Sequence, residues 1–179
     1  RTADKVQGYD WDRYYSLIRK LQPNACISIC GPDVRWIGNE AGESREEEWS
    51  VVPKSIMVTE RNPGYWRQLD TMPNSTWKDI GSRDFIKDYD ELIWYPAEVD
   101  VSIRPSWGYV EGEEKQLYSL ETLLYMYEKA VGGNATLLLN VPPNKEGLFD
   151  LEDVERLAEL GKAIRGLFSR PQTAGAKAF

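Results

Sequence analysis

The sequence contains no histidine. That absence excludes a Ser-His or Cys-His nucleophile system and any histidine-ligated metal within these 179 residues. Lysine and arginine total 22 against 29 acids, and the net charge of −7 argues against a nucleic-acid partner, because phosphate binding needs a basic face. No apolar run approaches the roughly 20 residues that span a bilayer, so we expect no membrane partner.

Cysteine is also scarce. The only two, Cys26 and Cys30, stand in "ACISIC". A strand would place both on one face, too far apart along it for an easy disulfide. We therefore expect two buried free thiols.

Aromatic residues, in contrast, are abundant, with seven Trp and ten Tyr. The 41% apolar fraction is that of a globular protein, and 179 residues suffice for one domain with a core. Trp and Tyr combine a flat apolar face with a polar group, and exposed examples in an acidic protein suit the faces of sugar rings. Most of them are expected in the core.

Helical spacing, caps and stops predict helices over three segments, and two apolar runs and one alternation of charged and apolar residues predict three strands. The expected helices are 9–22, 119–131 and 151–168, and the expected strands are 25–31, 98–104 and 135–141. Ser119 is a candidate N-cap. The remaining stretch, 32–98, is rich in Pro, Gly, Asn and Trp and indicates a long functional loop with short irregular elements.

Strands that alternate with helices indicate an α/β fold with a parallel sheet. Each expected strand is followed by a polar segment, and these segments are 31–40, 104–109 and 140–145. Both a (β/α) barrel and a doubly wound sheet place their sites at the carboxyl ends of the strands. No glycine-rich phosphate loop is present to favour a nucleotide.

The segment "RWIGNEAGESREEEW", residues 35–49, concentrates acids behind a Gly-Asn pair. Its Glu40 follows that pair directly, and Trp36 and Trp49 bracket it. A carboxylate between indoles can have its pKa raised by desolvation, which a general acid needs. Taken alone, Glu40 is better interpreted as a surface loop acid than as a catalytic group, and Glu47 and Glu48 are weak competitors for the role.

Three long segments carry a resemblance to a known family. They are "LQPNACISICGPDVRWIGNEAGESREEEWSVVP", "WYPAEVDVSIRPSWGYV" and "SLETLLYMYEKAVGGNATLLLNVPPNKEGLFDLEDVERLAELG". They resemble, in order, segments of α-L-fucosidases, in particular the group that acts on α-1,3 and α-1,4 branches. The match covers nearly all of residues 9–168.

The resemblance implies a retaining glycoside hydrolase without a metal or organic cofactor. It implies that residues 1–168 are the C-terminal half of a (β/α)8-like TIM barrel, with 169–179 as a linker to a following domain. The implied partner is a fucosylated glycan, and the implied setting is periplasmic or secreted.

Site residues follow from the same resemblance by position. Glu40, in "GNE", matches the general acid/base. Trp107 matches the aromatic that flanks the fucose ring, in a segment that departs from the family at its two neighbours, Ser106 and Gly108. The remaining expected substrate-binding residues are Arg104, Glu98, Trp36 and Trp49. A structural salt bridge is the alternative for Arg104, and loop packing is the alternative for the two tryptophans.

In this family the nucleophile is an Asp in a motif resembling "WFDGA", upstream of the matched region, and this chain has no such motif. Asp4, Asp10 and Asp12 lie before or at the first helix and are not assigned that role. We expect the missing half of the barrel, or a second copy, as a protein partner. A non-catalytic carbohydrate-binding module and a structural half-domain are the competing hypotheses.

Overall fold

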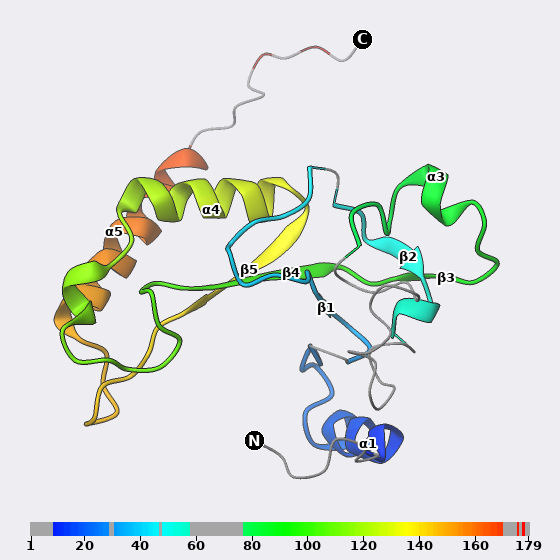
Figure 1. Cartoon of the computed structure of the whole chain (residues 1–179), viewed down its shortest axis with the longest axis horizontal. Coiled ribbons are helices and arrows are strands. Elements are labelled where there is room, and N and C mark those ends of the chain that lie inside the picture. Colours follow the sequence, from blue (N-terminus) through cyan, green and yellow to red (C-terminus); the bar gives the residue numbers. More distant parts are fainter. Residues whose placement is uncertain are drawn as a thin grey trace. The chain divides into compact units, whose positions relative to one another are not determined.

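The computed structural model describes residues 9–28, 31–46, 48–57, 77–169, 175 and 177. The chain divides into two units, each with its own apolar core. Unit 1 comprises Arg1–Asp100 and Lys129–Leu138, and unit 2 comprises Val101–Glu128 and Leu139–Phe179. Figure 1 labels the helices and strands along the chain. Among the described residues, no helix has the length and apolar character that crossing a membrane requires.

In unit 1 the first helix, α1 (Trp11–Leu21), confirms the helix expected over 9–22. It begins at Asp10, whose side chain accepts a hydrogen bond from the Arg13 amide at 3.1 Å. Near its end, Arg19 forms an ion pair with Asp33, and this bond lowers the pKa of the Asp33 carboxyl. No residue of α1 is buried, and its large exposed apolar side chains are Tyr14, Leu17 and Leu21.

The strand expected over 25–31 is wrong for its described part, because residues 25–28 form no strand. The Ile27 amide donates to the Asp33 carboxylate at 2.7 Å, and the Asp33 amide donates back to the Ile27 carbonyl at 3.3 Å. These bonds close a turn and occupy groups that a strand would offer to a neighbour. Cys26 is a free thiol but exposed, which corrects the expected burial, and Cys30 lies outside the described residues.

A three-stranded sheet has the order β1 (Arg35–Trp36), β4 (Ala97–Ser102), β5 (Ala135–Asn140). β1 and β4 are parallel, and the Ile37 amide donates to the Glu98 carbonyl at 3.0 Å just past the end of β1. β4 and β5 confirm the strands expected over 98–104 and 135–141, which are direct neighbours in the sheet.

The two faces of β4 differ in character within unit 1. Ala97 and Val99 point into an apolar cluster, whose other members are Ile37, Ala130, Ala135 and Leu137. Side chains alternate along a strand, so Glu98 and Asp100 lie on the opposite face. That polar face belongs to the site described below.

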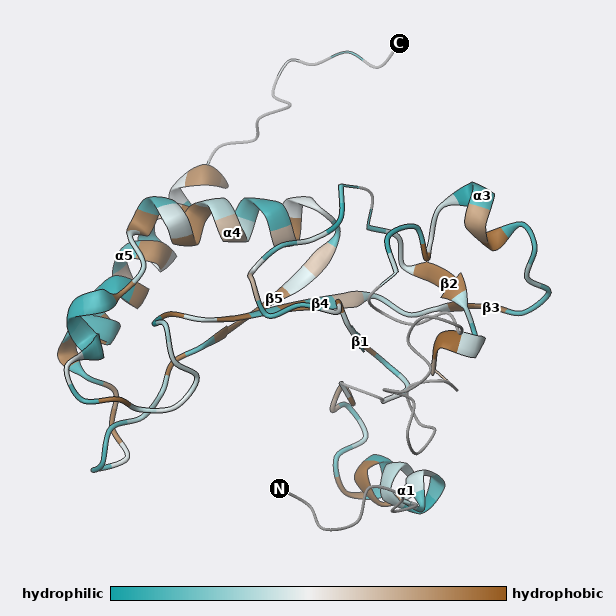
Figure 2. Ribbon diagram, viewed as in Figure 1, coloured by the Kyte–Doolittle hydropathy of each residue, from teal (hydrophilic) through white to brown (hydrophobic). Residues whose placement is uncertain are grey.

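A second sheet in unit 1 pairs β2 (Val51–Pro53) with β3 (Leu92–Trp94) in antiparallel register. It packs a core of four buried residues, Val52, Ile56, Ile80 and Tyr95. Figure 2 shows β2 as strongly hydrophobic. The short helix α3 (Arg83–Ile86) begins at Ser82, whose hydroxyl accepts from the Phe85 amide at 3.2 Å. These elements lie within the segment expected as a loop with short irregular elements.

Unit 2 contains the 3-10 helix η2 (Glu113–Gln116) and the helix α5 (Leu151–Leu167). The helix α4 (Leu120–Gly132) begins in this unit, and Ser119 caps it by accepting a hydrogen bond from the Thr122 amide at 3.1 Å. α4 and α5 confirm the helices expected over 119–131 and 151–168. The buried core of the unit consists of Ile103, Leu123 and Leu160.

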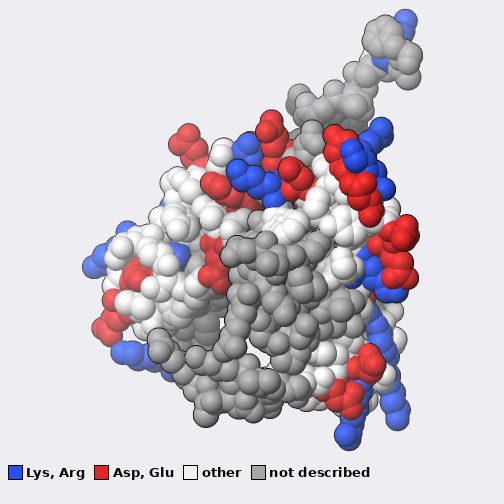
Figure 3. Space-filling view, turned by 45° about the vertical axis from the view of Figure 1, so that its right-hand side comes forward, with Lys and Arg blue, Asp and Glu red and all other residues white. Residues whose placement is uncertain are grey.

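Acidic and basic side chains lie interspersed over the described part of the face that Figure 3 shows. Such a surface is typical of a solvated protein.

Candidate functional site

Glu40 lies on a tight turn that follows the end of β1. Asn39 builds this turn: its side-chain oxygen accepts from the Ala41 amide at 3.0 Å, and its side-chain nitrogen donates to the Glu43 carbonyl at 3.1 Å. Gly38 precedes them with a φ of 104°, a conformation that disfavours any residue with a Cβ. Glu40 itself is exposed. The turn therefore presents a carboxylate to solvent at the carboxyl edge of a parallel strand pair.

The polar face of the β1–β4 pair adds a second carboxylate, Asp100. Trp36 Nε1 donates to Asp100 Oδ1 at 2.8 Å. Burial raises the pKa of Asp100, the Trp36 bond opposes that effect, and the negative charge of Glu40 raises the pKa further. Glu40 is thus close enough to Asp100 for their charges to interact. Glu98, two residues earlier on the same face, is buried and accepts from Ser28 Oγ at 3.1 Å.

The other acids of the 35–49 segment differ in their surroundings. Glu43 and Glu46 are exposed, and Glu47 lies outside the described residues. Glu48 is buried and forms ion pairs with both Arg35 and Arg45. A carboxylate held in this way is poorly suited to exchange protons with substrate and water, so Glu40 is the best placed of these described acids.

The two tryptophans of the segment also differ. Trp36 is half-buried and oriented by Asp100. Trp49 is 42% exposed. Its Cβ packs closely on Gly81, because a Cβ added at Gly81 would lie 2.3 Å from the Trp49 Cβ. Trp49 therefore combines loop packing with an exposed indole surface.

In unit 2, Trp107 is 40% exposed and lies on a braced turn. Its carbonyl accepts from Asn140 Nδ2 at 2.9 Å, and the same nitrogen donates to Ser102 Oγ at 3.0 Å. Ser106, where the chain departs from the family pattern, donates its hydroxyl to Glu113 at 2.8 Å. The turn is thus fixed by side chains, while the indole remains open to solvent.

Arg104 is buried in unit 2 and forms ion pairs with Asp150 and Asp153. Burial lowers the pKa of the guanidinium, and the bonds to the two aspartates outweigh that effect and raise it. The guanidinium carbon of Arg104, Cζ, lies 6.0 Å from the centre of the Tyr109 ring, within cation–π range. Arg104 Nη1 has no hydrogen-bond partner among the described residues. These contacts fit the salt-bridge alternative and tie the strand end to the start of α5.

Unit 1 therefore brings together Glu40, Trp36 and Glu98 of the expected residues, and adds Asp100. Sequence reasoning did not select Asp100, although the alternation in "EVDVS" places it on the face of Glu98. The described residues hold no cluster of three or more acid or thiol side chains arranged to bind a metal ion.

A parallel strand pair with carboxylates and an indole at its carboxyl edge places this chain in the α/β class. Comparison with known proteins identifies the family. The chain belongs to the α-L-fucosidase family of glycoside hydrolases, because the model of the family described as Alpha-L-fucosidase matches residues 9–165.

Individual relatives agree with this assignment. The chain is 36% identical to Alpha-L-fucosidase 1 of Arabidopsis thaliana over 169 residues, which are 93% of this chain and 29% of that protein. A Bacteroides ovatus ATCC 8483 protein of known crystal structure is 40% identical in sequence to this chain, and the two structures superpose with a TM-score of 0.78. The match covers 92% of this chain and 28% of that one.

A Ruminococcus gnavus GH29 fucosidase in complex with fucose is 27% identical, with a TM-score of 0.68, over 93% of this chain and 32% of that one. The chain thus spans about 30% of the length of these relatives. It is an α/β portion of the fucosidase fold.

Proposed function

We propose that this chain supplies the general acid/base, Glu40, to a retaining α-L-fucosidase that acts on α-1,3 and α-1,4 branches. The observation that carries the proposal is the Asn39 turn, which presents an exposed carboxylate at the carboxyl edge of β1 and β4 in a member of the fucosidase family. In such a mechanism a carboxylate nucleophile attacks the sugar carbon and Glu40 protonates the departing oxygen. Glu40 then removes a proton from the water that releases fucose.

The same proposal assigns residues 1–168 to the C-terminal half of a (β/α)8 barrel and 169–179 to a linker. The nucleophile then lies in the other half. Trp107 would flank fucose, and Trp36 and Trp49 would contact the sugars beyond it. Glu98 and Arg104 would orient hydroxyl groups or neighbouring side chains. The fucose bound in the Ruminococcus gnavus relative supports fucose as the sugar recognised.

The test of Glu40 uses the complete catalytic domain. Glu40→Ala should depress activity by roughly 10²–10⁴-fold on a natural branched oligosaccharide, because its poor leaving group needs protonation. An activated aryl fucoside should lose far less, and added azide should restore its turnover by replacing the activated water. The matched control is Glu43→Ala, an exposed acid on the same segment. Near-normal hydrolysis of the oligosaccharide by Glu40→Ala would place the acid/base elsewhere.

A second test uses the 179-residue chain alone. It should not hydrolyse an aryl α-L-fucoside, because retention requires two carboxyl groups about 5–5.5 Å apart and the nucleophile belongs to the other half. Its mass in solution should show self-association or aggregation, since half a barrel leaves sheet edges unpaired. Turnover that disappears with Glu40→Gln would show that the nucleophile lies within this chain. Asp100 would then be the first aspartate to replace.

A further inference from the structure

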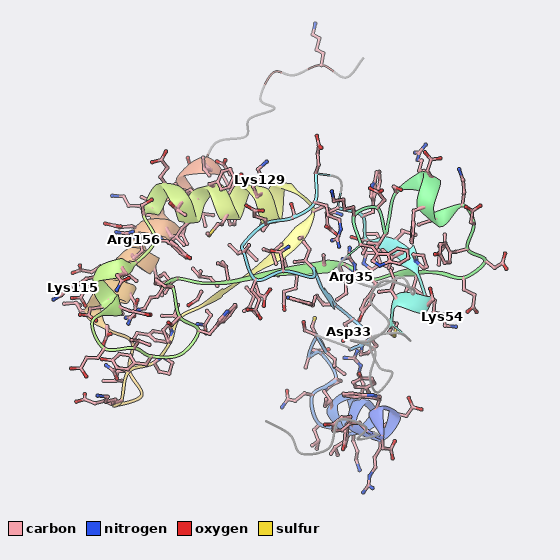
Figure 4. The ribbon with its side chains drawn as sticks, in the orientation of Figure 1. Asp33, Arg35, Lys54, Lys115, Lys129 and Arg156 are labelled. Atoms are coloured by element: carbon pink, nitrogen blue, oxygen red, sulfur yellow. The ribbon has the colours of Figure 1, made fainter. Side chains whose placement is uncertain are left out.

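The segment that carries Glu40 is closed at its base by a buried ion pair in unit 1. Arg35 lies in β1, where Figure 4 labels it, and Glu48 lies just before Trp49. Their side chains form a salt bridge and are 0% and 1% exposed. Because Glu40 lies between them in sequence, this contact joins the two ends of its loop.

Arg35 is anchored to the sheets as well as to Glu48. Its Nε donates to the Tyr95 carbonyl at 3.0 Å, and its Nη2 donates to the Trp49 carbonyl at 2.9 Å. Its own backbone amide donates to the Pro96 carbonyl at 3.0 Å. Arg35 therefore fixes the loop base to the connection between β3 and β4.

Glu48 is held from its other side by a second arginine. Arg45 Nη1 donates to Glu48 Oε2 at 2.8 Å, and Arg45 Nε donates to the Trp77 carbonyl at 2.8 Å. Each oxygen of Glu48 thus has an arginine of its own. Asn134 Nδ2 also donates to the Glu48 carbonyl at 3.0 Å, which ties the same residue to the turn after α4.

A buried ion pair of this kind has a large desolvation cost, and its net contribution to stability is often small. Its clearest effect is to select one arrangement of the groups that it joins, because an alternative loop path would leave a buried charge unpaired. The loop between the two ends has further fixed points: the Asn39 turn and Ser44, whose hydroxyl donates to the Lys129 carbonyl at 2.7 Å. Glu40 lies within the loop that this set of contacts supports.

We propose that Arg35, Arg45 and Glu48 form a loop clamp that positions the Glu40 carboxyl for proton transfer. The inference rests on the proposed acid/base role of Glu40. The clamp residues are positioning residues, since Glu48 is buried away from solvent and acts through the loop. A misplacement of about 1 Å at a reacting group can cost roughly 10²-fold in rate, so a change in the clamp should reach the chemistry.

The test measures, in the complete catalytic domain, the ratio of activity on an activated aryl fucoside to activity on a branched oligosaccharide. Glu48→Gln keeps the side-chain shape and removes the charge. It should raise this ratio roughly tenfold or more, because a displaced Glu40 fails first where the leaving group needs a proton. Glu46→Gln, the same charge change at an exposed position of the loop, should leave the ratio within about twofold.

Two further variants separate positioning from lost stability. Leu160→Ala, in the apolar core of unit 2, lowers the melting temperature without touching the clamp or its anchors, and its ratio should stay at the wild-type value. In a Glu40→Ala background, Glu48→Gln should have no further effect on the ratio, because both changes disable the same step. If Glu48→Gln prevents folding, Arg45→Lys, which retains the charge and loses the guanidinium geometry, takes its place.

The outcomes are distinct. The clamp proposal is overturned if Glu48→Gln changes the ratio no more than Leu160→Ala, or if its effect persists without Glu40. A failure of the proposed function would appear in a different arm of the experiment. Glu40→Ala would then leave the ratio unchanged, and the clamp would have no catalytic carboxyl to position. A selective rise in both Glu40→Ala and Glu48→Gln, without additivity, supports both proposals.

Discussion

Gly133 and Gly132 are adjacent at the end of α4, yet the structure predicts opposite effects for the same substitution. A Cβ at Gly133 would lie 2.3 Å from the Lys129 carbonyl oxygen and 2.4 Å from the Ser44 hydroxyl. A Cβ at Gly132 would meet nothing within 4 Å. Gly133 therefore allows the Glu40 loop to approach the helix end, where Lys129 is labelled in Figure 4, and Gly132→Ala is a matched control one residue away.

The magnitude follows from the contacts. Gly133→Ala must displace backbone or the loop, which costs about 1–3 kcal/mol as overpacking. It also breaks the Ser44–Lys129 hydrogen bond, worth about 0.5–1.5 kcal/mol. A stiffer unfolded chain offsets about 0.4–1 kcal/mol of that loss. The expected net destabilisation is about 2–3 kcal/mol, whereas Gly132→Ala, in the last helical turn, should stabilise by about 0.5–1 kcal/mol.

Urea unfolding of the complete catalytic domain measures both variants against the wild type. A Gly133→Ala protein as stable as Gly132→Ala would refute the close approach of the Ser44 loop to the helix end. Activity provides a second readout. Because Ser44 lies on the loop of Glu40, Gly133→Ala should also lower hydrolysis of the oligosaccharide more than that of the activated fucoside.

Other predictions concern the charged groups. Arg19 lowers the pKa of Asp33, so the ion pair that holds α1 should be present above the ordinary carboxyl pKa and lost as the pH falls through the lowered value. Proteolysis of the α1 segment should therefore rise in acid. The Asp33→Asn variant, which lacks the ion pair, should be cleaved at all pH values. Burial raises the pKa of Asp100, so its ionised form destabilises the fold above that raised value. Asp100→Asn should have the higher melting temperature near neutral pH. The difference should shrink as the pH falls through the raised pKa and vanish below the ordinary carboxyl pKa. Asp153→Asn leaves the buried Arg104 guanidinium incompletely paired and should cost about 3–5 kcal/mol, measured by urea unfolding, while an unchanged stability would contradict the ion pair.

The helices could be predicted because their signals are local. Asp10 and Ser119 cap α1 and α4 as side chains of that type do elsewhere, and the apolar spacing of each helix survives in the structure. The strand β5 is an apolar run and β4 alternates charged with apolar residues, and both signals are also local. β1 has only two residues, too few for any periodicity to reveal.

The failures are non-local. Residues 25–28 have the composition of a strand, but Asp33 takes the Ile27 amide and closes a turn instead. Trp36 and Asp100 meet across 64 positions of sequence, and no pattern within either segment indicates that pair. The Glu40 turn is itself a local feature, because Asn39 builds it from its own neighbours. Its role as acid/base follows from the family resemblance, since the local residues left the role open.

The buried pair of Arg35 and Glu48 also constrains how this sequence can change over time. Replacing Glu48 alone leaves the buried Arg35 without that carboxylate in a site closed to water, whereas replacing the whole ion-pair network with apolar residues of similar volume can be nearly neutral for stability. The two positions should therefore be inherited as a unit, either both charged or both apolar. Among related sequences, we expect positions 35 and 48 to co-vary, and the lineages that lost both charges to hold the loop by some other contact.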